Sequence, residues 1–299
     1  MNNALKRGVR GAFDRAAATY DENAYLQQEV ARRLDERLEM VRLAPTRILD
    51  AGCGTGYALP LLRRRYPDSG LLGLDIAPGM LAKARTRLPA PGWLARLLAP
   101  SSRPAPALLC GDLEALPLRH DCLDMLWSNL ALQWLDQPEA VFRELRRVLR
   151  PGGLLIFSTF GPDTLKELRA AFSGLDGHAH VNRFVDMHDI GDALVHAGFA
   201  NPVMEMEYIT LTYADLKGVL RDLKGIGAHT VLEGRREGLM GKAEWRRLAE
   251  NYETFRRDGR LPATYEVIYG HAWVGDKTAW EEGRKVIQIK IEQRQAGLR

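Results

Sequence analysis

Cysteine is scarce in this sequence, with only three residues in a chain of 299. Cys53, Cys110 and Cys122 have no paired spacing and stand in apolar stretches. A disulfide framework or a zinc site would need paired, closely spaced cysteines, so neither is expected. The pattern predicts reduced thiols in a cytoplasmic protein without a metal site.

The chain also lacks a long hydrophobic run, an apolar leader and a strong net charge. No stretch reaches membrane-spanning length, and residues 1–15 contain charges but no apolar segment. The formal net charge is only +4 and there is no basic tail, which argues against a nucleic-acid partner. With 46% hydrophobic residues, the chain can bury a large core. We therefore expect a globular protein whose partners are neither nucleic acid nor a membrane.

Three of the 28 glycines stand at alternate positions in the stretch 48–56. A short apolar strand ends there in Asp50, followed by glycines at positions 52, 54 and 56, and leucines then recur at helical spacing. Glycine lets backbone and ligand approach closely, and a helix N-terminus attracts polar ligand groups. The third glycine of a dinucleotide fingerprint would fall on Tyr57. The spacing G-x-G-x-G therefore predicts a different nucleotide-like ligand.

Two more apolar strands end in carboxylates downstream of the glycine turn. Asp75 lies about 20 residues beyond the turn, where an acidic residue can accept hydrogen bonds from a ribose. Asp112 ends the next strand, where an adenine amino group needs an acceptor. Either aspartate could instead cap a helix, but their order favours binding. Further strands at 122–128 and 154–158 complete a strand–helix alternation, which predicts a parallel sheet.

This order of motifs resembles that of the class I S-adenosylmethionine-dependent methyltransferases. The resemblance implies a Rossmann-like α/β fold with a seven-stranded, mostly parallel sheet, helices on both faces and S-adenosyl-L-methionine as cofactor. Enzymes that methylate nucleobase amines often carry an Asn/Asp-Pro-Pro-aromatic sequence after the fourth strand, and its absence here argues against that substrate class. The candidate cofactor-binding residues are Asp50, Gly52, Gly54, Gly56, Asp75, Ile76, Asp112, Leu113 and Asn129.

Residues 1–44 are predicted to be helical, with a break near residues 19–22. Leu26, Val30, Leu34 and Leu38 recur at every fourth position and form one apolar helix face. In many small-molecule methyltransferases a similar segment folds over the bound cofactor as a lid. Tyr20 would then contact the ligand; the alternative is a ring packed against the core with its hydroxyl in water.

The second half of the chain contains two further predicted strands, 203–213 and 264–273. About 50 residues of helical, arginine-rich sequence separate them, far more than a hairpin loop needs. We expect these residues to form a helical cap above the carboxyl ends of the strands, where ligands of such sheets bind. The predicted division is a lid (1–44), a cofactor-binding core (45–160) and a C-terminal part (161–299) with the cap mainly in 161–200 and 214–262.

Several motifs resemble those of the malonyl-acyl-carrier-protein O-methyltransferases of biotin synthesis. The resemblance covers residues 10 to 275, with the proline-rich stretch 91–106 as an extra surface insertion of no assigned role. The motifs are Phe13–Asp21, Phe160–Leu165, Val181–Phe184, Leu223–Ala228 and Pro262–Tyr265.

The resemblance implies methyl transfer to the free carboxylate of a malonyl thioester on acyl carrier protein or coenzyme A. This carboxylate is ionised at neutral pH, so no catalytic base is assigned. Once buried it needs a cation or strong donors. A methyltransferase of quinone or other small-metabolite synthesis and a non-catalytic methyltransferase-like assembly protein stay open as alternatives. The candidate substrate-binding residues are Tyr20, Asn182, Arg183, Lys224, Arg235 and Tyr265, with His229 as a further donor.

An acidic carrier protein would also need a basic docking surface. One candidate is a row of four arginines on one side of a helix, and the others are three arginine pairs in the cap. The cap pairs are expected nearer the active-site mouth, but the sequence does not choose among them. The row is Arg143, Arg146, Arg147 and Arg150, and the pairs are 235–236, 246–247 and 256–257.

Overall fold

The computed structural model describes residues 3–88, 105–135, 137–175, 180–226, 240–275, 280–281 and 284–285. His229, Arg235 and Arg236 lie outside these residues, as does nearly all of the stretch 91–106. What the sequence predicts for them stays a prediction.

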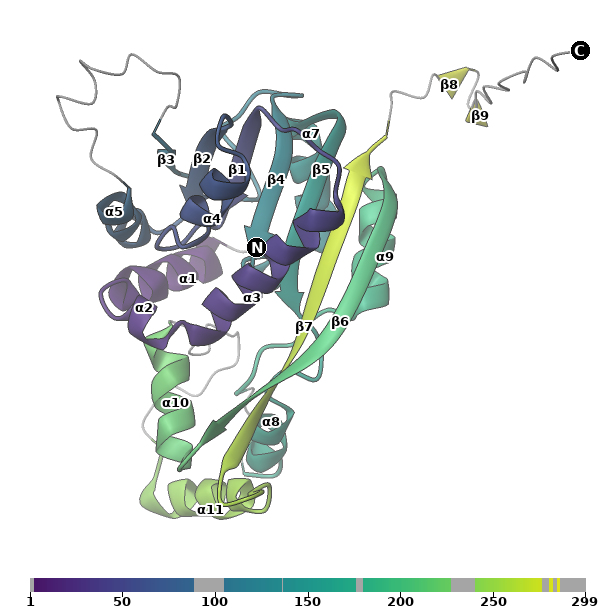
Figure 1. The fold of residues 1–299 in the computed structure, drawn as a ribbon. Helices are drawn as coiled ribbons and strands as arrows, with labels where there is room; N and C mark the ends of the chain where they lie inside the picture. Colours follow the sequence, from purple (N-terminus) through teal and green to yellow (C-terminus); the bar gives the residue numbers. More distant parts are fainter. Residues whose placement is uncertain are drawn as a thin grey trace, which may run out of the picture.

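The centre of the molecule is a seven-stranded sheet in the order β3-β2-β1-β4-β5-β7-β6 (Figure 1). The strands are β1 (Arg47–Ala51), β2 (Gly70–Asp75), β3 (Ala107–Cys110), β4 (Leu123–Asn129), β5 (Leu149–Phe160), β6 (Phe199–Tyr213) and β7 (Leu261–Val274). The first five pair in parallel, and β7 runs antiparallel to both of its neighbours. This arrangement confirms the predicted fold class. The strand order reverses between β1 and β4, and ligands of such sheets bind outside the carboxyl ends of the strands at that point.

Helices cover both faces of the sheet. On one face, α3 (Tyr25–Arg37) and α4 (Ala58–Arg65) bury their leucines against β1, β4 and β5. On the other face, α7 (Pro138–Val148) packs against β5, and α9 (Met187–His196) packs against β6 and α7 (Figure 1). Helix α5 (Pro78–Arg87) follows β2 and packs against α1 (Asn3–Ala16). The alternating strand and helix patterns therefore bury two apolar layers, one on each side of the sheet.

The N-terminal segment is helical to Met40 and not, as predicted, to residue 44. Helix α2 (Tyr20–Asn23) separates α1 from α3, and the chain leaves the helical conformation at residues 17–19, earlier than predicted. The short 3-10 helix η1 (Leu38–Met40) ends the segment, and residues 41–46 are not helical. Pro45 disfavours a helical conformation at Ala44, the residue before it, so the predicted helix could not extend to residue 44.

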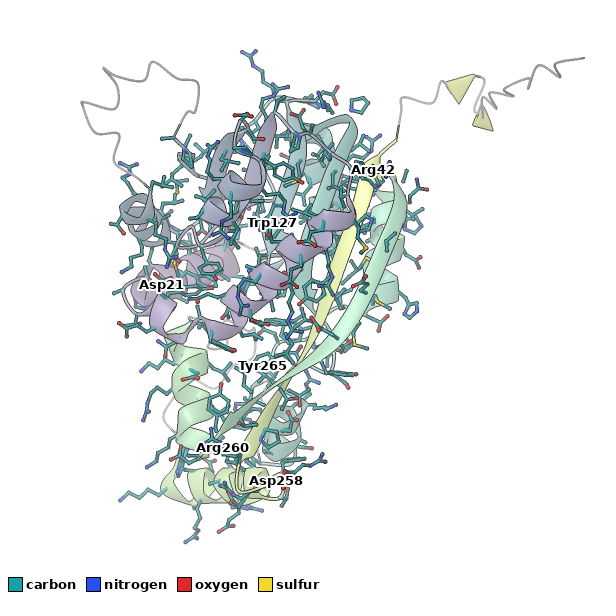
Figure 2. The ribbon with its side chains drawn as sticks, in the orientation of Figure 1. Asp21, Arg42, Trp127, Asp258, Arg260 and Tyr265 are labelled. Atoms are coloured by element: carbon teal, nitrogen blue, oxygen red, sulfur yellow. The ribbon has the colours of Figure 1, made fainter. Side chains whose placement is uncertain are left out.

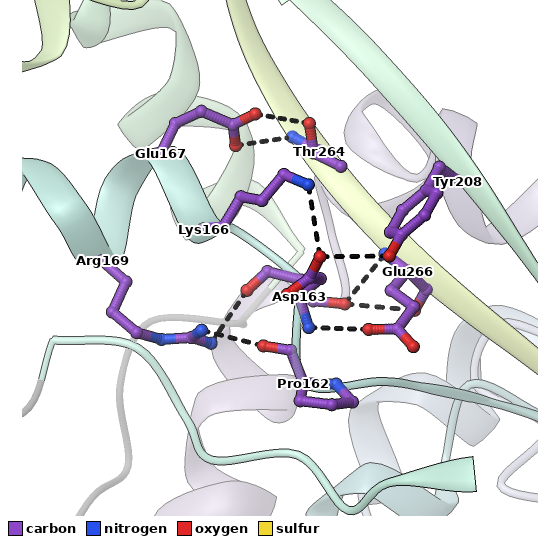
Figure 3. A network of polar contacts seen from close by, with 9 residues as sticks. Pro162, Asp163, Lys166, Glu167, Arg169, Tyr208, Thr264 and Glu266 are labelled. Atoms are coloured by element: carbon purple, nitrogen blue, oxygen red, sulfur yellow. Dashed lines mark hydrogen bonds and ion pairs between the residues drawn. The ribbon is translucent and has the colours of Figure 1, made fainter.

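The cap is built from α8 (Lys166–Phe172), which follows β5, and from α10 (Leu216–Gly225) and α11 (Lys242–Glu253), which lie between β6 and β7. Two buried glutamates fasten it to β7 (Figure 3). Glu167 accepts hydrogen bonds from the backbone N–H and the hydroxyl of Thr264, at 3.0 and 2.5 Å. Glu266 accepts one from the backbone N–H of Asp163 at 2.7 Å. The loop after β5 is thereby held against the last strand.

The remaining described strands, β8 (Trp280–Glu281) and β9 (Arg284–Lys285), pair only with each other. Among the described helices, none combines the length and the apolar character needed to cross a membrane.

Candidate functional site

The glycine turn between β1 and α4 is tight on one side and open on the other. Gly52, Gly54 and Gly56 all have positive φ angles, of 78°, 52° and 75°. A Cβ atom on Gly52 would lie 2.4 Å from that of Ala131, which follows β4, so no side chain fits there. Gly54 faces open space, with no atom within 4 Å of a Cβ placed on it. A ligand can therefore approach the backbone of the turn closely.

Asp75 at the end of β2 holds this turn in place. Its carboxylate accepts hydrogen bonds from the N–H groups of Gly54 at 2.9 Å and Ala77 at 2.8 Å. Burial raises the pKa of Asp75, although these hydrogen bonds oppose the change. Ile76, the next residue, is half-buried beside it. The predicted ribose acceptor thus lies directly against the glycine turn.

Asp50 is the buried group of the site that lacks a partner. Its side chain lies at the end of β1, and its Oδ2 atom has no hydrogen-bond partner in the described part of the chain. Burial, and then the nearby charge of Asp75, raise the pKa of Asp50 to about 8. An unpaired buried carboxylate is costly, and a cation placed beside it would remove that cost. The site is therefore suited to a ligand that carries positive charge.

Asp112 lies two residues beyond the end of β3 and has local partners already. Its Oδ1 accepts a hydrogen bond from the N–H of Glu114 at 2.9 Å, and its Oδ2 lies 2.5 Å from the ammonium of Lys6 in α1. Leu113 flanks the glycine turn, because a Cβ on Gly52 would come within 3.9 Å of its side chain. An adenine amino group at this position would share Asp112 with Lys6.

Asn129, at the end of β4, connects the sheet to the lid. Its Nδ2 donates to the carbonyl oxygen of Gln27 in α3 at 3.0 Å, and its Oδ1 accepts from the hydroxyl of Ser158 in β5 at 2.8 Å. Both ends of the amide are therefore occupied by protein groups. In this arrangement Asn129 positions the lid helix over the strand ends.

A second contact fastens the lid to the glycine turn. The hydroxyl of Thr55 donates to Asp21 of α2 at 2.6 Å, and Arg87 at the end of α5 pairs with the other carboxylate oxygen of Asp21 at 2.5 Å. Figure 2 shows Asp21 on this side of the molecule, above α10. The lid is thus held at both the first and the fourth strand of the sheet.

Aromatic side chains of the lid line up between the turn and the cap. The ring centroid of Phe13 lies 6.4 Å from that of Tyr20 and 5.4 Å from that of Trp134, which it meets edge-on. Burial, and then the charges of Asp75 and Asp21, raise the pKa of Tyr20. Tyr20 therefore lies close to the predicted ribose acceptor, with its hydroxyl kept neutral.

Beyond Trp134 the cap encloses a cavity of about 200 Å³. Its walls are mostly apolar, with Phe160 between the sheet and the cap. Asn182, Lys224 and Tyr265 line it together, so three predicted substrate-binding residues share one cavity. Figure 2 shows Tyr265 on β7 where the strand passes from the sheet into the cap. Lys224 is the one lysine or arginine among the described lining residues.

Arg183 is placed elsewhere. It lines a separate pocket against α7 and α9, although Gln133, Phe160 and Phe184 line both spaces. The sequence assigned no role to Gln133. Its Nε2 donates to the carbonyl oxygen of Leu130 at 2.6 Å, while its buried Oε1 has no partner in the described part of the chain. Its position just past the end of β4 is the feature of the sequence that could have marked Gln133 as a candidate.

The predicted row of arginines is not on a single helix, because α7 ends at Val148 and Arg150 lies at the start of β5. The row lies at the end of the molecule away from this cavity (Figure 1). All four side chains are already engaged within the protein. Arg143, Arg146, Arg147 and Arg150 contact, in that order, Glu139, the carbonyl oxygen of Gly198, Glu144 and Asp124. These contacts hold the edge of the sheet together.

Comparison with known proteins agrees with this geometry. Residues 49–157 match a family model described as a methyltransferase domain. A solved structure from Bacillus halodurans C-125, described as a methyltransferase, has a TM-score of 0.55 at 15% identity and covers 82% of this chain and 99% of that chain. That likeness concerns the fold alone. With the strand order and the glycine turn, it shows the fold of the class I methyltransferases.

Two curated relatives are similar over almost their whole length. One, from Laribacter hongkongensis, is 57% identical over 95% of both chains. The other, from Gallionella capsiferriformans, is 56% identical over 96% of this chain and 97% of the relative. Both are named malonyl-[acyl-carrier protein] O-methyltransferase. The chain belongs to this family, which confirms the resemblance found in its sequence.

Proposed function

We propose that this protein transfers a methyl group from S-adenosyl-L-methionine to the free carboxylate of a malonyl thioester carried by acyl carrier protein, an early step of biotin synthesis. The observation that carries the proposal is that the cavity lies next to the lid over the glycine turn. The cavity is largely apolar and is lined by Trp134, Asn182 and Lys224. The ring of Trp134 also contacts Phe13 of the lid. A donor site and a site for an anionic acyl group therefore adjoin.

The residues at the glycine turn fit the proposed cofactor. When bound, S-adenosyl-L-methionine would supply a methyl group activated by a sulfonium, in a molecule that also carries an ammonium. Asp50 offers the buried, unpartnered carboxyl that such positive charge would stabilise. Gly54 leaves room for close approach, and Asp75, beside the glycine turn, would accept hydrogen bonds from the ribose. Tyr20 and Phe13 would cover the ligand from the lid side.

The cavity suits an anionic acceptor that needs no catalytic base. A malonyl carboxylate is ionised at neutral pH, so the protein has to orient it and to remove its water. Phe160 and Leu168 provide apolar walls, and Lys224 and Asn182 provide a cation and a donor for the carboxylate. Attack by the carboxylate oxygen forms the O–CH₃ bond as the S–CH₃ bond breaks, and both opposite charges disappear. Exclusion of water favours such a step.

The decisive experiment follows the methyl group directly. The protein is incubated with S-adenosyl-L-methionine and malonyl carrier protein, and the carrier is weighed by mass spectrometry. We expect a gain of one methyl group, and no gain when acetyl carrier protein replaces the malonyl form. Absence of the gain with the malonyl carrier would refute the proposed function. The same assay with malonyl-coenzyme A determines whether the carrier protein is required.

A matched pair of variants identifies the cation that holds the carboxylate. Lys224→Met removes the charge from the cavity, whereas Arg183→Met removes one from the adjoining pocket. A hydrogen bond to a charged group contributes about 1.5–3 kcal/mol, so Lys224→Met should raise KM about 10- to 100-fold. Lys224→Arg should restore much of the loss. An equal or larger effect of Arg183→Met would assign the clamp to Arg183 instead.

The cytoplasmic location expected from the sequence stays a prediction. The reaction proposed here requires only that the protein meets its carrier and its cofactor in the same compartment.

A further inference from the structure

Helix α10 exposes a row of three cations, and only the last of them, Lys224, has been given a role so far, as the candidate clamp for the carboxylate. Lys217, Arg221 and Lys224 follow one another at intervals of four and three residues and are exposed. Residues at such intervals share one face of a helix, and the row extends over about 10 Å. The opposite face is fixed in the core by Leu216 and Val219, which are buried. The orientation of the row toward solvent is therefore set by packing.

These three cations have no ion pair within the residues that the structure describes. The acidic residue on the same helix, Asp222, faces away from the row and toward Tyr213. Burial, and then the charge of Asp222, raise the pKa of Tyr213. The four arginines at α7 and the start of β5 differ in this respect, since each contacts a partner inside the protein. Among the residues that the structure describes, the α10 row combines exposure, regular spacing and available charge next to the cavity.

The position of the row relates it to the cavity. Lys224 belongs both to the row and to the cavity lining, and Leu220 and Leu223 of the same helix also line the cavity. The row therefore starts at the rim of the cavity and extends outward along the helix. In Figure 1, α10 lies on the outside of the cap below α2, at the other end of the molecule from α7. A partner lying along α10 would have its attached group next to the opening.

We propose that Lys217, Arg221 and Lys224 form the docking face for the acidic carrier protein, which delivers its acyl arm over the rim at Lys224. This inference rests on the proposed function, since it specifies where the partner of that reaction binds. The net charge of the whole chain is only +4, so attraction of an acidic protein has to come from a local cluster of charge. Charges at the rim of an interface mainly affect encounter and orientation, which suits a partner that must leave after each turnover.

The test separates docking from binding of the acyl group. The double variant Lys217→Glu/Arg221→Glu leaves Lys224 intact. The control Arg64→Glu/Arg85→Glu makes the same change in charge at exposed positions in the last turns of α4 and α5, near the opposite edge of the sheet. Each variant is assayed with malonyl carrier protein and with the malonyl thioester of N-acetylcysteamine, which has no carrier surface.

At low ionic strength the α10 variant should raise KM for malonyl carrier protein by at least about tenfold, because local fields change encounter rates by 10- to 1,000-fold. Its KM for the small thioester, and its kcat for both substrates, should match those of the unaltered protein. The control should leave all four values unchanged. The effect should shrink as salt is added. An unchanged KM for the carrier substrate, or an equal rise for both substrates, would overturn the proposal.

Failure of the proposed function gives a different pattern. If the unaltered protein methylates neither thioester, the reaction is wrong, and docking is then decided by binding alone. Fluorescence anisotropy of a labelled carrier protein measures its Kd without any reaction. Binding that the α10 variant weakens and the control does not would support the docking face. Equal binding by all three proteins, or none by the unaltered protein, would refute it.

Discussion

The unpartnered carboxyl of Asp50 predicts that the free protein becomes less stable as pH rises. The pKa of this group is raised from 3.8 to about 8 by burial and then by Asp75. Because the folded pKa lies above the unfolded one, the stability that the bound proton provides is fully present below about pH 4 and is lost as pH rises toward 8. In that window the folded state holds up to one more proton, which lowers the free energy of unfolding by up to about 1.4 kcal/mol per pH unit.

Asp50→Asn removes this titration while keeping the shape of the side chain. Asparagine stays neutral, so the variant should gain stability relative to the unaltered protein as pH increases. A change of 1 kcal/mol shifts Tm by about 2–4 °C in domains of 150–250 residues, so the difference in Tm should grow by up to about 3–5 °C per pH unit. The same substitution should weaken binding of S-adenosylhomocysteine, because that ligand keeps the ammonium that the ionised carboxyl would pair with.

Thermal unfolding from pH 5.5 to 7.5, with and without S-adenosylhomocysteine, measures both effects. Titrating groups far from Asp50 are common to the two proteins and cancel in the difference. The thiol of Cys53 stays protonated in this range, because burial, and then the charges of Asp50 and Asp75, raise its pKa well above its usual value. A difference in Tm that is independent of pH would refute the reasoning, since Asp50 would then be ionised throughout. Ligand stabilisation that is equal in both proteins would show that the carboxyl does not contact the cationic part of the ligand.

Two further predictions concern the turn and the lid. Gly52→Ala places a methyl group against Ala131 at a positive φ, so we expect a loss of about 1–3 kcal/mol in stability and of measurable cofactor binding, read by urea unfolding and calorimetry. Thr55→Val removes the hydroxyl that holds Asp21, so the lid should open more often. We expect faster proteolysis near residues 17–24 without a change in Tm beyond about 2 °C; unchanged proteolysis would show that the other lid contacts, from Arg87 and Asn129, hold the lid without Thr55.

The cofactor side of the site could be predicted from the sequence because each signal is local. Strand, turn and helix follow one another around Gly52, and Asp75 sits at a strand end that a parallel sheet brings to the same edge. The fold could be predicted for the same reason, because apolar residues recur at strand and helix spacing along the chain. Asn129 shows the limit of this reasoning. Its place at a strand end could be predicted, but its bonds to Gln27 and Ser158 depend on two segments far away in the sequence.

The substrate-binding residues could not be assigned from the sequence, because which of them share a cavity depends on the tertiary structure. Arg183 and Asn182 are neighbours in sequence, yet they line two different spaces because their side chains leave the backbone in different directions. Gln133 was missed because an amide after a strand has no spacing that marks it. The four arginines from Arg143 to Arg150 have a regular spacing, but only the structure shows that Arg150 lies beyond the end of α7 and that partners such as Glu144 and Asp124 engage the row.

The contact between the lid and the cap links the two halves of the reaction. A Cβ on Gly225, at the end of α10, would come within 2.5 Å of the side chain of Asn23 in α2, so the two helices are in direct contact there. If the lid moves as a unit, this contact would carry its movement to the helix that borders the acyl cavity. Occupancy of either site would then change affinity at the other by the same factor, as thermodynamic linkage requires. The enzyme would in this way favour closure when both substrates are present.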